Sequence, residues 1–181
     1  MSVAINKKNF SKSAIVTIIT GIIITTASFI YGHTPFFILL NADGGFFADD
    51  FFRYYTNMGD GLIWLPVLLI VMFVLKKKDA WKLVFFMFAI STLIVQVIKQ
   101  IIFAGRLRPS AAITDITQFH AVDGVELYRS GSFPSGHTTT AFCIYILFCI
   151  LLRSSWWLYA GFTYAILVGY SRVYLAEHFP L

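Results

Sequence analysis

Long runs of apolar residues, almost free of charge, set the main constraint on how this 181-residue chain can fold. Hydrophobic residues make up 58% of the sequence and charged residues only 13%, about half the charged share of a soluble domain. The runs do not alternate in polarity as the strands of a membrane β-barrel do. We therefore predict one all-α domain, a polytopic membrane helical bundle. Its five predicted spans cover about residues 13–31, 61–75, 80–103, 138–152 and 156–175.

Basic residues cluster at the ends of alternate spans. If the five spans cross in turn, these clusters share one face, which the positive-inside rule assigns to the cytoplasm. The opposite face then holds eight of the nine acidic residues. We predict a multi-pass protein of the cytoplasmic (inner) membrane, whose partner is the bilayer and not a nucleic acid. The clusters are Lys7, Lys8 and Lys12, then Lys76, Lys77, Lys78 and Lys82, and finally Arg153.

The outer face still carries six cations, against the preference of that rule. Arg53 and Arg129 are interpreted as solvated loop charges. The other four lie beside the ends of spans, where a cation is costly unless it has a partner. These four are therefore candidates for a function, and they are Lys99, Arg106, Arg108 and Arg172.

The first candidate stretch is "KQIIFAGRLRPS", residues 99–110. Lys99 and Arg106 are seven residues apart and share a face if the helix continues for two turns. Gly105 and Pro109 favour a helix end nearby, which places Arg108 at the start of the loop. The alternative interpretation is that these basic side chains only extend from a helix end toward water.

The second stretch is "PSGH", which opens the predicted fourth span. Gly136 has no side chain to keep an anion from its backbone N–H, and Ser135 offers a hydroxyl donor. The helix that begins at Thr138 directs free N–H groups and the positive end of its dipole outward. His137 can donate a proton near neutral pH. The alternative is a simple turn that happens to contain a histidine.

The third stretch is "SRVYLAEHFPL", residues 171–181. Arg172 closes the fifth span, and His178 follows it by six residues. Glu177 is next to His178, but adjacent side chains on a helix point apart. A histidine at this depth could equally be a satisfied interfacial residue.

Together the three stretches supply two imidazoles, several cations and a helix N-terminus, with no metal-ligand spacing such as His-x-x-x-His. Cations neutralise phosphoryl oxygens. One histidine can attack phosphorus and form a phosphohistidine, while the other protonates the leaving oxygen. The residues thus predict phosphoryl chemistry with no cofactor and no metal.

The order K…RP, PSGH, SR…H resembles the membrane branch of the type 2 phosphatidic acid phosphatase superfamily, over about residues 50–181. The resemblance implies a six-helix membrane bundle with its active site at the outer end. It implies His178 as the nucleophile and His137 as the general acid. It also implies a set of phosphate-binding residues, namely Lys99, Arg108, Ser135, the Gly136 amide and Arg172.

The sequence departs from the family pattern at two places. The usual first motif has six residues between Lys and Arg-Pro, whereas eight separate Lys99 from Arg108. Arg106 keeps the usual distance without the proline, so either arginine can be the phosphate ligand, and the proline context favours Arg108. The third motif of the family continues to an aspartate that orients the nucleophile, and that position falls at 182. We therefore expect the domain, residues 1–181, to be incomplete at its C-terminus, with five of six spans.

These features predict an integral membrane phosphatase that acts on a lipid phosphate or a prenyl pyrophosphate from the extracytoplasmic side. Phosphatidate, phosphatidylglycerophosphate, undecaprenyl pyrophosphate and lipid A phosphates are all compatible with the residues, and the loop from Thr114 to Ser130 is expected to select among them. Two alternatives stay open, a lipid phosphotransferase and a non-catalytic protein that binds anionic lipid. The sequence does not indicate an oligomeric state.

Overall fold

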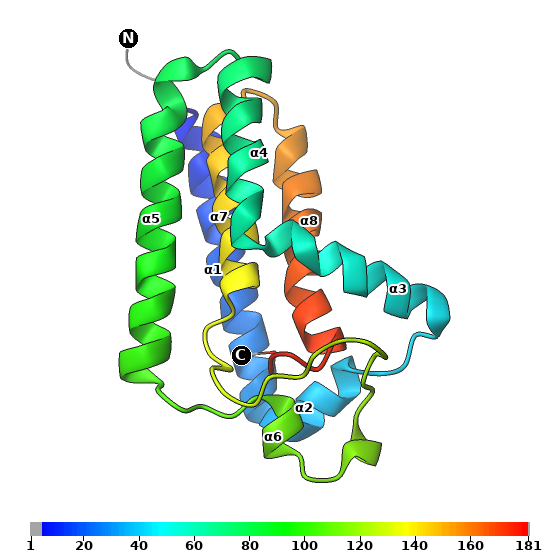
Figure 1. Cartoon of the computed structure of the whole chain (residues 1–181). Coiled ribbons are helices and arrows are strands. Elements are labelled where there is room, and N and C mark those ends of the chain that lie inside the picture. Colours follow the sequence, from blue (N-terminus) through cyan, green and yellow to red (C-terminus); the bar gives the residue numbers. More distant parts are fainter. Residues whose placement is uncertain (1–4, 181) are drawn as a thin grey trace.

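The computed structural model describes residues 5–180, and all the regular structure in them is helical (Figure 1). The all-α prediction is confirmed, whereas Leu181, where the third motif breaks off, lies outside the described residues. Short 3-10 turns connect the helices, and the π-helical turns η3 (Ile70–Val74) and η5 (Ile98–Ile102) extend two of them. The α-helices are α1 (Lys7–Tyr31), α2 (His33–Leu40), α3 (Phe46–Tyr55), α4 (Trp64–Leu69), α5 (Trp81–Val97), α6 (Pro109–Ala112), α7 (Gly136–Leu151) and α8 (Trp156–Tyr174). The 3-10 turns are η1 (Thr56–Gly59), η2 (Gly61–Ile63), η4 (Lys78–Ala80) and η6 (Ile116–Gln118).

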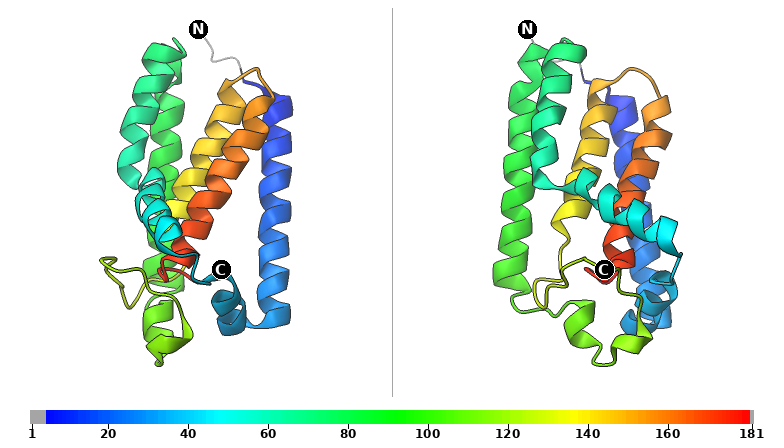
Figure 2. Two further views of the ribbon diagram at one scale, coloured as in Figure 1. Left: turned by 90° about the vertical axis from the view of Figure 1, so that its right-hand side faces the viewer. Right: turned by 45° about the vertical axis from the view of Figure 1, so that its right-hand side comes forward.

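Helix α7 forms the centre of the bundle and contacts α1, α5 and α8 (Figures 1 and 2). On one side, Ile144 and Leu147 pack against buried residues of α4 and α5. On another side, Ala141 and Tyr145 pack against Ala165 and Val168 of α8. The two cysteines of α7 are free thiols. The central helix is therefore held in place from several directions.

The outward faces of α1 and α5 are apolar and exposed, as expected of helices surrounded by lipid. Ile18 and Ile22 of α1 are about as exposed as Leu93 of α5. A soluble protein rarely exposes so much contiguous apolar surface. Among residues 5–180, two helical segments, Lys7–Tyr31 and Lys78–Ile102, are long and apolar enough to cross a membrane. A third crossing is possible if Phe46–Gly59 and Gly61–Val74, bent by 58°, form one broken span, so the count of five spans stays a prediction.

The predicted basic clusters gather at one end of the bundle. The start of α1, the connection from η3 to α5 and the connection from α7 to α8 all lie at the upper end in Figure 1. The opposite end carries α2, α6, the loop of residues 113–135 and the chain that leaves α8 (Figures 1 and 2). Helix α3 lies across the bundle axis (Figure 1). The two ends therefore differ in charge and in structure, and the candidate motifs meet at the end with the loops.

Candidate active site

Lys99 reaches the site from the last turn of the α5–η5 helix. The helix ends at Ile102, so it does not continue to Arg106. The side chain of Lys99 lies over the backbone of Gly131, since a Cβ at that glycine would be 3.4 Å from the Lys99 Cδ. Gly131 also has a φ of +73°, a conformation that favours glycine. Lys99 thus packs directly on the stretch that leads into "PSGH".

The two arginines of the first motif have different environments. The backbone N–H of Arg108 donates to the carbonyl of Arg129 at 3.0 Å, next to an antiparallel bridge between Leu107 and Ser130. The Arg108 side chain is mostly buried, and its Nε donates to the carbonyl of Ser130 at 2.9 Å. Arg106 is exposed and lies over the ring of Phe103. Arg108 is therefore buried against the loop of residues 113–135, whereas Arg106 stays exposed.

Ser135 caps the N-terminus of α7. Its Oγ accepts a hydrogen bond from the Thr138 N–H at 3.3 Å, and its carbonyl accepts from the Thr139 N–H and hydroxyl. Open space surrounds Gly136, since a Cβ built there meets no heavy atom within 4 Å. The N–H groups of the first turn and the bare glycine form the type of helix end that binds anions.

His137 lies on the more open side of the site. Its side chain is 28% exposed, and its Nε2 is 3.9 Å from a carboxylate oxygen of Asp60. Gly59 packs closely against it, because a Cβ at Gly59 would be 2.8 Å from the His137 carbonyl oxygen. The η1–η2 corner therefore fixes the backbone of His137 and supplies a nearby carboxylate. No local sequence signal points to Asp60, which is 77 residues away along the chain.

Arg172 is buried on the last turns of α8. Its Nη1 donates to the hydroxyl of Thr56 at 2.7 Å, and its Nη2 is 3.3 Å from the carboxylate of Glu177. The Nε of Arg172 is buried and has no hydrogen-bond partner among the described residues. An unpaired buried donor is costly, so this N–H is available for an anionic ligand.

The chain leaves the helix before His178, which changes the expected direction of Glu177. Helix α8 ends at Tyr174, and Ala176 has a φ of +54°. The N–H groups of Glu177 and His178 both donate to the carbonyl of Arg172. Both side chains are buried, and the Glu177 carboxylate contacts Arg108 as well as Arg172. Residues 177 and 178 therefore do not lie on a helix, so the helical rule applied to Glu177 and His178 does not hold here.

His178 is only 4% exposed, and its Nδ1 hydrogen-bonds to the carbonyl of Ser132. Since a carbonyl only accepts, Nδ1 carries the proton, and the lone pair on Nε2 is free. Burial, together with the cations of Arg172 and Arg108, keeps the pKa of His178 well below its usual value. The imidazole is therefore neutral at physiological pH, as a nucleophile must be.

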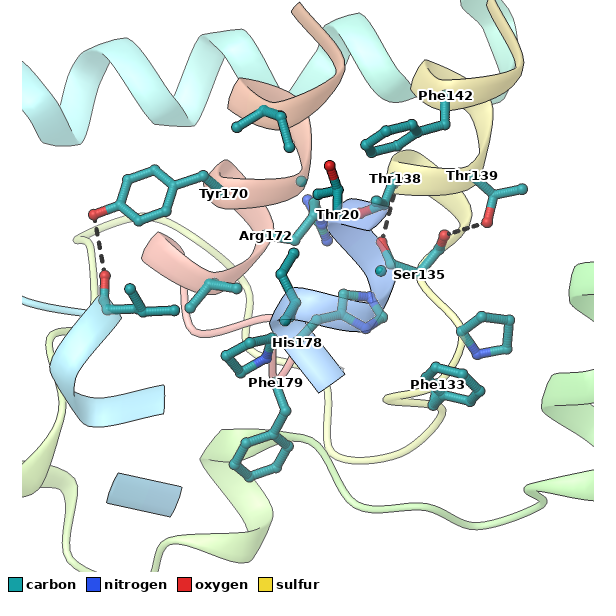
Figure 3. A pocket seen from close by; sticks show the side chains of 18 of the residues that line it. Thr20, Phe133, Ser135, Thr138, Thr139, Phe142, Tyr170, Arg172, His178 and Phe179 are labelled. Carbon is teal, nitrogen blue, oxygen red and sulfur yellow. Dashed lines mark hydrogen bonds between the residues drawn. The ribbon is translucent and has the colours of Figure 1, made fainter. Parts of the chain in front are cut away.

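Arg172 and His178 both line a cavity of about 370 Å³ between α1, α7 and α8 (Figure 3). Ser132 and Ser135 contribute polar groups, and most of the remaining lining is apolar. The lining residues from the helices include Thr17, Thr20, Gly21 and Ile24 of α1, Thr138, Thr139 and Phe142 of α7, and Ile166, Gly169 and Tyr170 of α8. The cavity combines a cationic and nucleophilic part with apolar walls.

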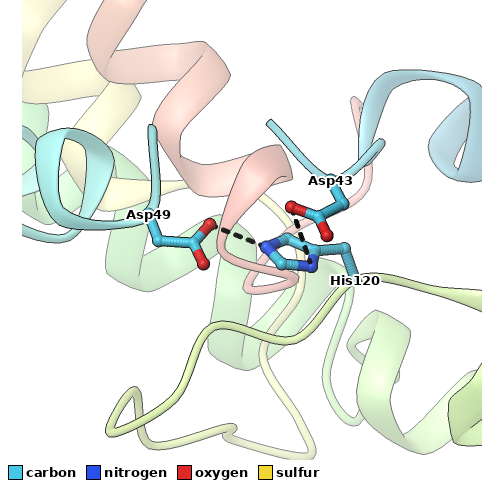
Figure 4. Close-up of side chains that lie close together, drawn as sticks. All are labelled: Asp43, Asp49 and His120. Atoms are coloured by element: carbon cyan, nitrogen blue, oxygen red, sulfur yellow. Dashed lines mark hydrogen bonds and ion pairs between the residues drawn. The ribbon is translucent and has the colours of Figure 1, made fainter. Parts of the chain in front are cut away.

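One cluster of possible metal ligands lies among the described residues. Oxygen and nitrogen atoms of Asp43, Asp49 and His120 lie within 4.8 Å of one another (Figure 4). His120 Nε2 is 2.8 Å from Asp49 Oδ1, which also accepts from the Tyr174 hydroxyl. Asn41 bonds to the backbones of His120 and Tyr174. These contacts fasten the loop of residues 113–135 and the α2–α3 connection to the end of α8, so the cluster has a structural explanation.

The predicted site residues thus fall into two groups. Arg108 and Arg172 share a contact with the Glu177 carboxylate, and the N–H of His178 donates to the carbonyl of Arg172. The second group, Ser135, Gly136 and His137, lies at the N-terminus of α7, and Lys99 lies on the stretch that leads to it. Thr56, Asp60 and Glu177 are contacts that sequence reasoning missed.

Two known proteins are similar to this chain in sequence or in structure. The chain is 28% identical over 140 residues to a lipid A 4'-phosphatase of Bacteroides thetaiotaomicron, a match that covers 72% of this chain and 61% of that relative. The chain therefore spans less than two thirds of the length of that curated relative. The structure is similar to the crystal structure of Aquifex aeolicus LpxE, with a TM-score of 0.66 at 28% identity, over 80% of this chain and 81% of that one.

A family model covers the segment that contains all three motifs. Residues 80–181 match the model of the PAP2 superfamily, which is the type 2 phosphatidic acid phosphatase superfamily. This segment is more than half of the chain and includes every predicted catalytic and phosphate-binding residue. The chain therefore belongs to the PAP2 superfamily.

Proposed function

We propose that this membrane protein is a phosphatase that hydrolyses a lipid phosphate or a prenyl pyrophosphate through a phosphohistidine. The observation that carries the proposal is the cavity shared by His178 and Arg172, which joins a buried nucleophile and an unpaired cationic donor to apolar walls. A phosphate attached to an apolar chain fits both parts. The similarity to a lipid A 4'-phosphatase makes lipid A phosphates the first substrate class to test.

The proposed reaction has two displacements at phosphorus. In the first, the His178 Nε2 lone pair forms a bond to phosphorus, the bond from phosphorus to the lipid oxygen breaks, and His137 gives a proton to that oxygen. Burial and the charge of Arg172 lower the pKa of His137 to about 4, so the mechanism requires the bound phosphate dianion to raise that pKa and keep His137 protonated. In the second, water attacks phosphorus, His137 takes a proton from the water, and the P–N bond breaks. Inorganic phosphate leaves, and both histidines return to their starting states.

Fixed cations are proposed to stabilise the charge that develops on the phosphoryl oxygens. The side chains of Lys99, Arg108 and Arg172, and the N–H groups at the start of α7, supply positive charge without a bound ion. A metal is therefore not required in the proposed mechanism. Release of phosphate from a lipid A phosphate should be unchanged by excess chelator, and orthovanadate should inhibit because it adopts the geometry of the transition state.

The assay also separates the proposed function from its alternatives. Loss of activity in chelator, restored by magnesium, would contradict the proposed mechanism. Phosphate that appears on an added lipid acceptor, and not in solution, would identify a phosphotransferase. Binding of lipid phosphate without any turnover would identify a lipid-binding protein.

We also propose that the site faces outward from the cytoplasmic membrane. The support is the gathering of the basic clusters at the end of the bundle opposite the motifs. Lys78→Cys and Arg106→Cys place a thiol at an exposed residue of each end, in a background with Cys143 and Cys149 replaced. In intact cells an impermeant thiol reagent should label position 106 only. Labelling at 78 alone would reverse the orientation.

A further inference from the structure

Glu177 is a carboxylate placed among the proposed phosphate ligands. It follows the end of α8 in a turn held by the Arg172 carbonyl, which accepts from the N–H groups of both Glu177 and His178. The side chain of Glu177 is only 5% exposed. A buried carboxylate is unfavourable unless it is paired, so its partners indicate what it does.

Both partners of Glu177 are arginines proposed to bind phosphate. Its Oε2 forms an ion pair with Arg108 and lies 3.3 Å from Arg172 Nη2. The side chains of these two arginines are about 90% buried. One carboxylate oxygen thus bridges two guanidinium groups, as a phosphoryl oxygen does when two arginines bind it.

The arginines are also held by groups other than this carboxylate. Arg108 donates from Nε to the carbonyl of Ser130 and from Nη1 to the backbone carbonyl of Glu177 at 3.2 Å. Arg172 donates from Nη1 to Thr56. These neutral acceptors fix the two guanidinium groups, so the carboxylate has a role beyond positioning them.

The balance of charge near the site indicates what that role is. Lys99, Arg108 and Arg172 carry three positive charges, whereas a phosphate monoester dianion carries two negative ones. The carboxylate of Glu177 supplies the remaining negative charge. Without it, the site would carry excess positive charge and would bind inorganic phosphate, the product, more tightly.

We propose that Glu177 is a resident counter-anion of the phosphate site. Its carboxylate occupies positions on Arg108 and Arg172 that phosphoryl oxygens take in the complex, gives them up when substrate binds, and takes them back as phosphate leaves. Glu177 therefore weakens the binding of phosphate and speeds its release. This inference rests on the proposed function only in identifying these arginines as phosphate ligands.

The test measures equilibrium binding of inorganic phosphate to the purified protein in detergent, and it requires no turnover. Glu177→Gln removes the charge and keeps the size of the side chain. The Kd for phosphate should fall by about tenfold or more, because a competing like charge has been removed. Asp123→Asn, which removes an exposed charge from the loop of residues 113–135, is the matched control and should leave the Kd unchanged.

The opposite result has a clear meaning. An unchanged or weaker affinity for phosphate in Glu177→Gln would show that Glu177 only holds the arginines in place, and it would overturn the proposal. A variant that shortens the side chain, Glu177→Asp, provides a second test if Glu177→Gln does not fold. It moves the carboxylate away from the arginines, so phosphate should bind more tightly than in the unmodified protein, and equal or weaker binding overturns the proposal.

Measurements of phosphate binding and of lipid phosphate hydrolysis together distinguish failure of this inference from failure of the proposed function. Tighter binding of phosphate by Glu177→Gln in a protein that hydrolyses no lipid phosphate would support the inference and reject the phosphatase. Normal hydrolysis with no change in the phosphate Kd would reject the inference and leave the phosphatase in place. No phosphate binding by either form would reject the inference.

Discussion

The two histidines of the site lie in contrasting surroundings. His178 is 4% exposed and hydrogen-bonded to Ser132, and residues 172–178 form a compact turn around it. The side chain of His137 is 28% exposed, and its Nε2 is 3.9 Å from the carboxylate of Asp60. The surroundings of His178 are thus preorganised, whereas those of His137 are more open. This difference suits the proposed roles, since a nucleophile must hold one direction and an acid must reach the oxygen of a large leaving group.

Substitution of the buried histidine should have the largest effect. His178→Ala should abolish both turnover and the phosphoenzyme, because no nearby group replaces the Nε2 nucleophile. Turnover of a lipid phosphate and acid-quench trapping of the phosphohistidine measure the two steps. A phosphoenzyme that persists in His178→Ala would show that another residue is the nucleophile.

Substitution of the more open histidine should have a smaller effect that depends on the substrate. His137→Ala should slow formation of the intermediate by about a hundred to ten thousand-fold, because the lipid oxygen leaves unprotonated. A nitrophenyl phosphate has a leaving group that needs less protonation, so it should recover much of this loss. The same substrate should recover none of the His178→Ala loss, and equal recovery in both variants would contradict the assigned roles.

The two arginines of the first motif extend the comparison between buried and open groups. Arg108→Ala should lower kcat/KM by about a hundredfold, since it removes a buried donor to the phosphoryl group. Arg106→Ala is the matched control and should change kcat/KM by less than about threefold, because Arg106 is exposed. A larger loss in Arg106→Ala than in Arg108→Ala would identify Arg106 as the phosphate ligand.

The pH dependence should show the smallest effect. The pKa of His178 is lowered from 6.5 by burial and by Arg172, so the imidazole stays neutral as the pH falls to 6.5. Loss of activity from protonation of His178 should therefore begin only at more acidic pH. The measurement is a profile of kcat/KM, corrected for ionisation of the substrate. An acid limb of His178 with a midpoint at or above 6.5 would contradict the buried environment of this side chain.

Sequence reasoning identified the all-α fold and the motifs, because both depend on local patterns. Apolar runs and the "PSGH" tetrapeptide can be recognised without knowledge of any tertiary contact. The helices α2 and α3 were missed, since residues 32–60 were interpreted as an outer connection between spans. Short helices of this kind depend on packing against the rest of the fold.

The site contacts that the sequence did not predict depend on where the chain turns and on which distant segments pair with each other. Glu177 turns to the arginines because the chain leaves α8 after Tyr174 and Ala176 adopts a positive φ. The sequence placed the end of the fifth span near residue 175 but did not predict this turn. Arg108 was favoured over Arg106 by its proline, and the pairing of residues 106–108 with 129–132 supplies the physical reason. Thr56 and Asp60 approach the site only through the fold.

One wall of the cavity comes from a part of the chain outside the family segment. Residues of α1 line it, and open space lies beside Gly21, whereas the family model begins at residue 80. Part of the cavity wall is thus encoded outside the stretch that holds the three motifs. If the cavity holds the apolar chain of the proposed substrate, mutations in α1 should alter which chains fit without touching a histidine or an arginine of the site. In evolution or in protein engineering, the preference for a lipid could then change while the residues proposed to bind phosphate stay the same.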